Sequence, residues 1–305
     1  MRRHFARCLF ALGFVLAAAN PGALAQETQP FVTIDVPGAT STVALDINDA
    51  GDIVGSYIAA GRTHGYLLDR NGQFYWIDVP GAVFTRAAGI NARRDIVGTY
   101  RLPTDPTSVR HGFLLSEGQF TTVDPPGAVF TNPLGINEWG DIVGRFCVTV
   151  PCQPESPNVH GFLLSDGEFT TIDVPGARAT NAWKINARGD IVGGYTDADG
   201  KKQVFLLGGH KRGFITIDVP GVVETGNDNG GINSQRDIVG VYCDTAPCKG
   251  ASLDAHGFLL SRGLLTTIDV PGAISTNAFG INERGDIVGV YEDAAGLHGF
   301  LLSRW

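Results

Sequence analysis

The sequence has little positive charge, a single methionine and no long apolar segment beyond its N-terminal region. Lys and Arg number 23 against 31 Asp and Glu, which gives a formal net charge of -8 over 305 residues. This balance excludes a general nucleic-acid-binding protein, because such proteins need clustered Lys and Arg. The chain also lacks a helical periodicity of apolar residues and is rich in Gly, Thr, Val and Ile. Both features exclude a helical bundle.

Common catalytic and metal-binding motifs are missing as well. The sequence has no phosphate-binding glycine-rich loop, no Gly-x-Ser-x-Gly nucleophile motif and no zinc-type spacing of His or Cys. Its Asn-x-x-Gly-Asp segments offer oxygen ligands for calcium, but they lack the dense carboxylates of calcium loops, so tight turns are favoured. We therefore predict no catalytic residue, no metal site and no cofactor.

The first 25 residues have the pattern of a secretory signal peptide. Arg2, Arg3 and Arg7 precede a short apolar stretch at 8–19, and residues 23–25 read Ala-Leu-Ala, a small-x-small cleavage site. The apolar stretch is shorter than the roughly 20 residues that span a bilayer. We predict a signal peptide over 1–25 and one domain over 26–305, in a secreted or periplasmic protein without a transmembrane segment. An amphipathic transit peptide is the alternative.

Six copies of one unit fill the chain from residue 31 to its C-terminus. A Thr-Ile-Asp-Val-Pro-Gly phrase, with small variations, has its aspartate at Asp35, Asp78, Asp124, Asp173, Asp218 and Asp269. An Ile-Asn phrase with a following Asp-Ile-Val-Gly begins at Ile47, Ile90, Ile136, Ile185, Ile232 and Ile281. A His-Gly-aromatic-Leu-Leu phrase begins at His64, His111, His160, His256 and His298, and Gln203 stands in the remaining copy. A period of about 45 residues is typical of repeat architectures.

Each unit is predicted to form four short antiparallel strands. In the last copy the first strand spans 276–282 and the second spans 286–291, with a tight turn between them. The His-Gly-Phe-Leu-Leu phrase forms the third strand. A Phe-Thr-Thr-Ile-Asp strand follows in the other copies, and Val-Pro-Gly ends it because proline has no N–H for the ladder. Four strands in about 45 residues is the size of one propeller blade. The predicted fold is all-β, a six-bladed β-propeller of four-stranded antiparallel blades.

The two ends of the repeat array predict how the ring closes. Residues 31–35 form a fourth strand without a preceding unit, while the last copy stops after its third strand. Pairing the N-terminal strand with the last blade would complete that blade and remove two exposed strand edges. An open solenoid is the alternative, but it would need polar capping units. The glycines of Ile-Val-Gly, and those before most Ile-Asn pairs, are expected where blades pack face to face.

The repeated phrases resemble a known family. Ile-Asn-x-x-Gly-Asp-Ile-Val-Gly followed by His-Gly-Phe-Leu-Leu is similar to the HAF-repeat family of predicted extracellular bacterial proteins. The resemblance covers nearly all of the chain after residue 30. The family takes its name from a His-Ala-Phe triplet; this sequence has Gly at the Ala position in five copies and Gln203-Val204-Phe205 in the other. It implies an exported repeat protein and no particular reaction.

The repeated histidines are predicted to be structural. Each lies 13 or 14 residues before the aspartate of its own hairpin, so the two should face one another across the strands. The expected pairs are His64 with Asp78, His111 with Asp124, His160 with Asp173, His256 with Asp269 and, through ring closure, His298 with Asp35. A metal-ligand or general-base role is the less favoured alternative.

The cysteines predict two disulfides. Cys8 belongs to the signal peptide, and the others form two local pairs, Cys147 with Cys152 and Cys243 with Cys248, at equivalent positions of two units. In an exported protein such pairs are expected to be oxidised. A four-cysteine metal site would require two non-adjacent blades to meet.

Candidate ligand-binding residues are found where the copies differ. The longest connections span 100–110, 146–159 and 242–255, and they should emerge on the same face as the Val-Pro-Gly segments. On the innermost strands, a threonine common to all copies precedes a variable residue. We predict that the following polar side chains form a ligand-binding rim at the channel mouth: Arg86, Asn132, Asn181, Asn227 and Asn277. Plain hydrated turn residues are the alternative.

Three functions are consistent with this sequence. The favoured one is a non-enzymatic binding or scaffold module, monomeric, that holds a glycan or an extracellular protein. The second is a polysaccharide hydrolase or lyase, which would need two carboxylates roughly 5–10 Å apart. The acids outside the repeated phrases offer no convincing pair: Asp105, Glu155, Glu224 and Asp228. The third is a purely structural envelope protein.

Overall fold

The computed structural model describes residues 31–150, 152, 156–209, 213–217, 219, 224–225, 229–245 and 255–303. The predicted signal peptide at 1–25, together with Asp218, Asn227 and Cys248, lies outside these residues. Every regular element within the described ranges is a β-strand. None of the described segments forms a helix long and apolar enough to cross a membrane.

Three sheets have four strands each, all antiparallel. One has the order β10 (Phe130–Ile136), β11 (Ile142–Cys147), β12 (His160–Ser165) and β13 (Glu168–Ile172). The next has the order β14 (Ala179–Ile185), β15 (Ile191–Thr196), β16 (Lys202–Leu207) and β17 (Phe214–Ile217). The third has the order β1 (Phe31–Ile34), β25 (Gly296–Leu302), β24 (Ile287–Asp293) and β23 (Ser275–Ile281). Strands from the two ends of the repeat array therefore share one sheet.

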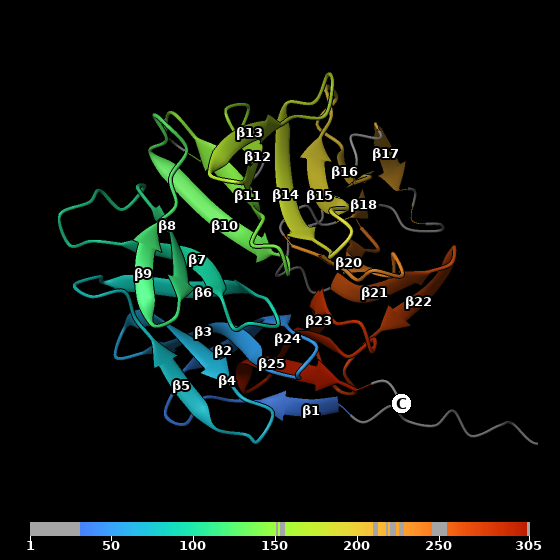
Figure 1. Cartoon of the computed structure of the whole chain (residues 1–305). Helices are drawn as coiled ribbons and strands as arrows, with labels where there is room; N and C mark the ends of the chain where they lie inside the picture. The colour runs from blue at the N-terminus through green and yellow to red at the C-terminus, as the bar shows by residue number, and fades with distance from the viewer. Residues whose placement is uncertain are drawn as a thin grey trace, which may run out of the picture.

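A fourth sheet repeats this order with its innermost strand in two pieces. It contains β18 (Glu224–Thr225), β20 (Ile238–Cys243), β21 (Ala255–Ser261) and β22 (Leu264–Ile268), and β19 (Gly231–Ile232) also pairs with β20. Figure 1 shows the sheets arranged around a common centre, with β5, β9, β13, β17 and β22 at the periphery. These observations confirm a β-propeller of four-stranded antiparallel blades.

The remaining strands form one sheet of eight. They are β2 (Ser41–Ile47), β3 (Ile53–Ala59), β4 (Arg62–Leu68), β5 (Phe74–Ile77), β6 (Phe84–Ile90), β7 (Ile96–Arg101), β8 (His111–Ser116) and β9 (Gln119–Thr122). A single parallel pair, Thr63 with Phe84, joins β4 to β6. The described part of the chain thus has five hydrogen-bonded sheets, four with the expected order, where six separate sheets were expected. Backbone hydrogen bonds also join the next repeats along the chain. Thr131 N donates to Arg110 O between the second and third repeats, and Thr180 N donates to Val159 O between the third and fourth.

The hydrophobic core lies between successive repeats. Six clusters each join the valine of one Ile-Val-Gly phrase to the buried ring on the third strand of the next repeat. The pairs are Val54 with Phe113, Val97 with Phe162, Val143 with Phe205, Val192 with Phe258, Val239 with Phe300 and Val288 with Tyr66. The last of these joins the final repeat to the first. Burying the rings and the valines removes apolar area from water at every junction.

The two sets of repeated glycines have different neighbours. A Cβ on Gly89 would lie 2.9 Å from Leu134 O and 3.0 Å from the Cα of Gly135, in the next repeat. This agrees with the expected close approach of neighbouring blades. A Cβ on Gly98, from an Ile-Val-Gly phrase, would instead lie 2.0 Å from Arg86 O and 2.8 Å from the Phe113 ring, both in its own repeat. The expectation that this second set serves blade-to-blade packing is therefore wrong.

The threonine common to all inner strands has a structural role. Its Oγ1 accepts the N–H of the residue six positions earlier, as Thr42 does from Val36 and Thr180 from Val174, both at 3.0 Å. In the third repeat that earlier residue is Pro125, which has no N–H. Thr131 Oγ1 is accordingly buried without a hydrogen-bond partner among the described residues.

Candidate functional site

Charged side chains meet on the central axis at one position of the inner strands. The residue before each Ile-Asn pair is glycine in four repeats, at Gly89, Gly135, Gly231 and Gly280, and is Asp46 or Lys184 in the other two. The strand register shifts just before both charged residues, between Ala44 and Asp46 and between Ala182 and Lys184. Such a bulge bends the strand and changes the direction of the next side chain. Asp46 and Lys184 were not among the residues predicted from the sequence, although alignment of the six copies shows that they replace the glycine of the other repeats.

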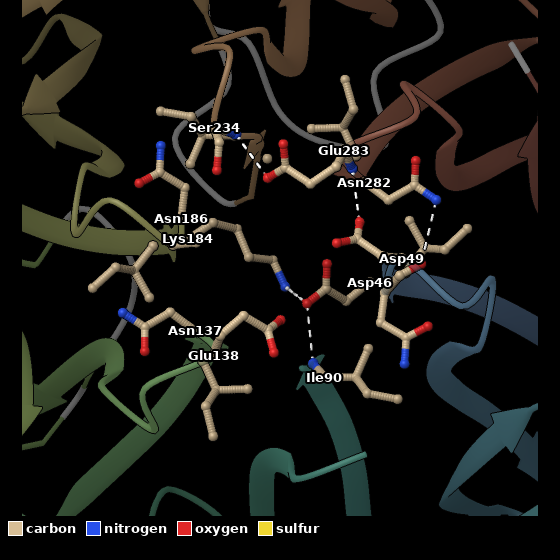
Figure 2. Close-up of a pocket in the computed structure, with 18 residues that line it drawn as sticks. Asp46, Asp49, Ile90, Asn137, Glu138, Lys184, Asn186, Ser234, Asn282 and Glu283 are labelled. Carbon is tan, nitrogen blue, oxygen red and sulfur yellow. Dashed lines mark hydrogen bonds and ion pairs between the residues drawn. The ribbon is translucent and has the colours of Figure 1, made fainter. Parts of the chain in front are cut away.

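Lys184 and Asp46 form a buried ion pair across the axis (Figure 2). Lys184 Nζ donates to Asp46 Oδ2 at 2.9 Å, to Ala88 O at 2.8 Å and to Leu134 O at 2.7 Å. Asp46 Oδ2 also accepts the N–H of Ile90 at 3.1 Å. Burial raises the pKa of Asp46 and lowers the pKa of Lys184, while each partner's charge opposes that shift in the other. Three acceptors around Nζ require three N–H donors, so the lysine is held as an ammonium.

A small pocket of about 140 Å³ lies beside this pair, among the Asn turns at one end of the inner strands. The isoleucine of every Ile-Asn phrase lines it: Ile47, Ile90, Ile136, Ile185, Ile232 and Ile281. Besides Asp46 of the ion pair, the carboxylates of Asp49, Glu138 and Glu283 also line it (Figure 2). Each accepts a backbone N–H of the neighbouring repeat: Ala92 N donates to Glu138, Ser234 N to Glu283 and Glu283 N to Asp49. The pocket therefore combines an isoleucine lining with negatively charged carboxylates that backbone hydrogen bonds hold in place.

The asparagines of the Ile-Asn phrases connect neighbouring turns around this pocket. In each turn the Oδ1 atom accepts the N–H of the aspartate four residues later, as Asn48 does from Asp52 at 2.9 Å. The Nδ2 atom donates to the backbone carbonyl oxygen of the equivalent asparagine in the next repeat. These bonds run from Asn48 to Asn91, Asn91 to Asn137, Asn186 to Asn233, Asn233 to Asn282 and Asn282 to Asn48. The turn interpretation of these segments agrees with this geometry.

Two arginines strengthen the contacts between these turns. Arg94 and Arg236 occupy the left-handed turn position, with φ of 64° and 63°, where the other repeats have glycine. Each forms a bidentate pair with the aspartate of the preceding repeat, Arg94 with Asp52 at 2.8 Å and Arg236 with Asp190 at 2.9 Å. Burial alone would raise the pKa of Asp52, but the hydrogen bonds and charge of Arg94 lower it.

The predicted rim residues lie on the same inner strands, toward the end opposite the Asn turns. Asn132, Asn181 and Asn277 are buried, with exposures of 4%, 0% and 4%, and Arg86 is half-buried. Asn181 Oδ1 accepts a hydrogen bond from Arg145 Nη1 at 3.3 Å. Arg86 lies close enough to Lys184 to contribute to its lowered pKa, after the larger effect of burial. These amides therefore lie within the packed part of the blades, and Asn227 is outside the described residues.

The histidine–aspartate pairs lie on the third and fourth strands. Nδ1 approaches the carboxylate to 2.7–2.9 Å in five repeats: His64 with Asp78, His111 with Asp124, His160 with Asp173, His256 with Asp269 and His298 with Asp35. In three of them Nε2 faces a second carboxylate, that of Asp105, Asp244 or Asp293. The described residues contain no group of three His, Cys, Asp or Glu side chains placed to hold a metal ion.

His298 gives the junction between the chain ends a pH dependence. Its partial burial would lower its pKa, but the hydrogen bonds and charges of Asp35 and Asp293 raise it above 6.5, and Tyr291 stacks on the ring. A pKa raised by folding stabilises the native state fully below pH 6.5, and this contribution is lost as the pH rises through the native pKa. We expect His298→Gln to lower the unfolding temperature more at pH 5.5 than at pH 8.5. An equal loss at both pH values would contradict the assignment.

One predicted disulfide is confirmed. Cys147 and Cys152 are bonded, with their Cα atoms 6.0 Å apart, and both side chains are buried. Cys243 is buried and disulfide-bonded, while its predicted partner Cys248 lies outside the described residues.

Comparison with known proteins supports the fold and little else. No protein-family model matches the sequence, and no curated protein is significantly similar to it. Among solved structures, a variant of the Aleuria aurantia lectin in complex with Fucα1-6GlcNAc has a TM-score of 0.52 at 11% identity, over 86% of this chain and 91% of the lectin. Acylaminoacyl peptidase from Pyrococcus horikoshii has a TM-score of 0.51 at 12% identity, over 84% of this chain and 42% of the peptidase. Virginiamycin B lyase from Staphylococcus aureus has a TM-score of 0.50 at 10% identity, over 90% of this chain and 99% of the lyase.

Proposed function

We propose that this chain is an exported, non-enzymatic binding protein of the HAF-repeat type that holds a glycan at the Asn-turn end of its channel. The observation that carries the proposal is the polar pocket beside the Lys184–Asp46 pair. Lys184 has no free lone pair for nucleophilic or base chemistry, because all three of its N–H groups are donated to acceptors. Lys184 is therefore suited to fixing the shape of the pocket rather than to reacting with a ligand.

The proposal includes a closed ring of six blades. Support comes from the pairing of β1 with β25, whose register runs from Phe31 opposite Leu302 to Ile34 opposite Gly299. The contact of Val288 with Tyr66 and the hydrogen bond from Asn282 to Asn48 O join the same two ends of the array. The eight-stranded sheet would then be two blades joined by one parallel pair. A closed ring explains why the six Ile-Asn isoleucines surround one pocket.

The chemistry of the pocket favours a neutral or amino sugar. Carboxylate oxygens of Asp49, Glu138 and Glu283 accept hydrogen bonds from hydroxyl or ammonium groups, and they would repel the carboxylate of a uronic acid. The lectin among the similar folds binds a fucosylated sugar, and this likeness is consistent with a glycan ligand without identifying it.

A glycan array probed with residues 26–305 tests this function. We expect binding to neutral or amino glycans, and about tenfold weaker affinity for Glu283→Gln, since a lost hydrogen bond to a charged group is worth about 1.5 kcal/mol or more. Glu117→Gln, on an exposed outer turn, is the matched control and should bind like the parent. Binding to no glycan would overturn the proposal. A loss with Arg86→Ala but not with Glu283→Gln would move the site to the opposite end of the channel.

A further inference from the structure

A second hollow on the Asn-turn face is larger than the central pocket. It has a volume of about 620 Å³ and lies between the turns of the third, fourth and fifth repeats, lined by Trp139, Asp141, Arg188, Asp190, Gly209 and Arg236 among others. This volume is in the range of small-molecule sites, roughly 300–1,000 Å³. The two hollows have Ile185 and Ala187 in common, so they adjoin one another.

Trp139 provides this groove with a rigid aromatic surface. Its side chain is 77% exposed, yet its Nε1 donates to Ala187 O of the next repeat at 3.0 Å. That bond satisfies the only polar atom of the indole and fixes its orientation, which leaves the ring faces for an apolar contact. The equivalent turn residues are Ala50, Arg93, Arg188, Gln235 and Arg284, so this is the only repeat with an aromatic residue there.

Arg188 lines the groove, and its guanidinium has no hydrogen-bond partner among the residues that the structure describes. At equivalent positions, Arg93 and Arg284 pair with the aspartate two residues later, Asp95 and Asp286. The corresponding partner of Arg188 is Asp190, which is already bound by Arg236 and by Gly209 N at 2.9 Å. The guanidinium of Arg188 therefore makes no hydrogen bond or ion pair with any residue that the structure describes.

Asp141 supplies the complementary acceptor. It is bonded to Ser165 Oγ at 2.6 Å and to Asn137 Nδ2 at 2.9 Å. Within the described ranges it has no cationic partner, in contrast to Asp52, Asp95 and Asp190. The groove thus combines a fixed aromatic face with a guanidinium, unpaired among the described residues, and a carboxylate.

We propose that this groove is a carbohydrate subsite in which a gluco-configured pyranose stacks on Trp139 while Arg188 and Asp141 bind its hydroxyls. A pyranose whose hydroxyls are all equatorial has flat apolar ring faces that match an indole. Because the groove adjoins the central pocket, the ligand is an oligosaccharide of two or more units that spans both. This inference rests on the proposed glycan-binding function and specifies its ligand.

Calorimetric titration with glucose and with cello-oligosaccharides of two to six units tests the proposal. We expect affinity to rise with length over the first units, and Trp139→Ala to weaken binding of the longest oligosaccharide about tenfold, the equivalent of about 1.4 kcal/mol. Arg188→Ala should weaken it to a similar extent. The matched control is Trp76→Ala, because Trp76 is also exposed, at 56%, but lies on the peripheral strand β5.

The outcomes separate this inference from the proposed function. Glycan binding on the array without binding of cello-oligosaccharides would overturn the gluco-configured subsite and leave the binding function standing. Equal losses for Trp139→Ala and Trp76→Ala would also overturn it, since the effect would then not be local to the groove. An array without any bound glycan would overturn both.

Discussion

Replacement of Lys184 by methionine is expected to lower the free energy of unfolding by about 3–5 kcal/mol, the cost of breaking a buried ion pair from one side. The substitution leaves the buried Asp46 carboxylate without its cation and removes the donor from Ala88 O and Leu134 O. Urea unfolding followed by far-ultraviolet circular dichroism measures the change. Because burial already raises the pKa of Asp46, its carboxyl should take up a proton more readily in the variant.

The double variant Lys184→Met with Asp46→Asn separates the charge effect from loss of packing. Neutralising both partners removes the uncompensated carboxylate, so the double variant should be more stable than Lys184→Met alone. A double variant as unstable as the single one would show that the lysine acts through packing or its two carbonyl contacts, and not through Asp46.

Replacement of Gly98 by alanine is expected to destabilise the fold by about 3 kcal/mol or more, at the upper end of the cost of overpacking a core. The added methyl group would lie 2.0 Å from Arg86 O, a backbone atom, and 2.8 Å from the Phe113 ring. A ring can rotate, but the carbonyl belongs to β6 and moves only if the pairing of β6 with β7 is disturbed. Thermal unfolding should show a large drop in melting temperature.

Gly213→Ala is the control for Gly98→Ala. Gly213 is exposed, and apart from its chain neighbours no atom of the described residues lies within 4 Å of an added Cβ, so alanine there should change stability by no more than about 0.5 kcal/mol. Similar melting temperatures for both variants would mean that the close approach at Gly98 is relieved without cost, contrary to the packing argument.

The Lys184–Asp46 ion pair could be found in the sequence only in part. Asp46 and Lys184 interrupt a column of glycines when the six copies are aligned, which marks both residues as unusual. Their contact was not predictable, because they are separated by three repeats and meet only when the inner strands surround a common axis. Trp139 and Arg188 are similar: the sequence identifies them as variable turn residues, while the hydrogen bond to Ala187 and the occupation of Asp190 by Arg236 belong to the assembled face.

The sequence by itself determined the repeat, the four strands of each unit, the cross-strand register of the histidine–aspartate pairs and the local Cys147–Cys152 bond. These depend on residues close in the chain, where alternation, turn residues and hairpin geometry restrict the backbone. Tertiary structure decided which end of the inner strands has the pocket, and it placed Asn132, Asn181 and Asn277 in the packed interior. The physical reason is that burial and charge pairing depend on the distance between repeats. That distance follows from how apolar side chains fill each junction, which the spacing of residues along the chain does not specify.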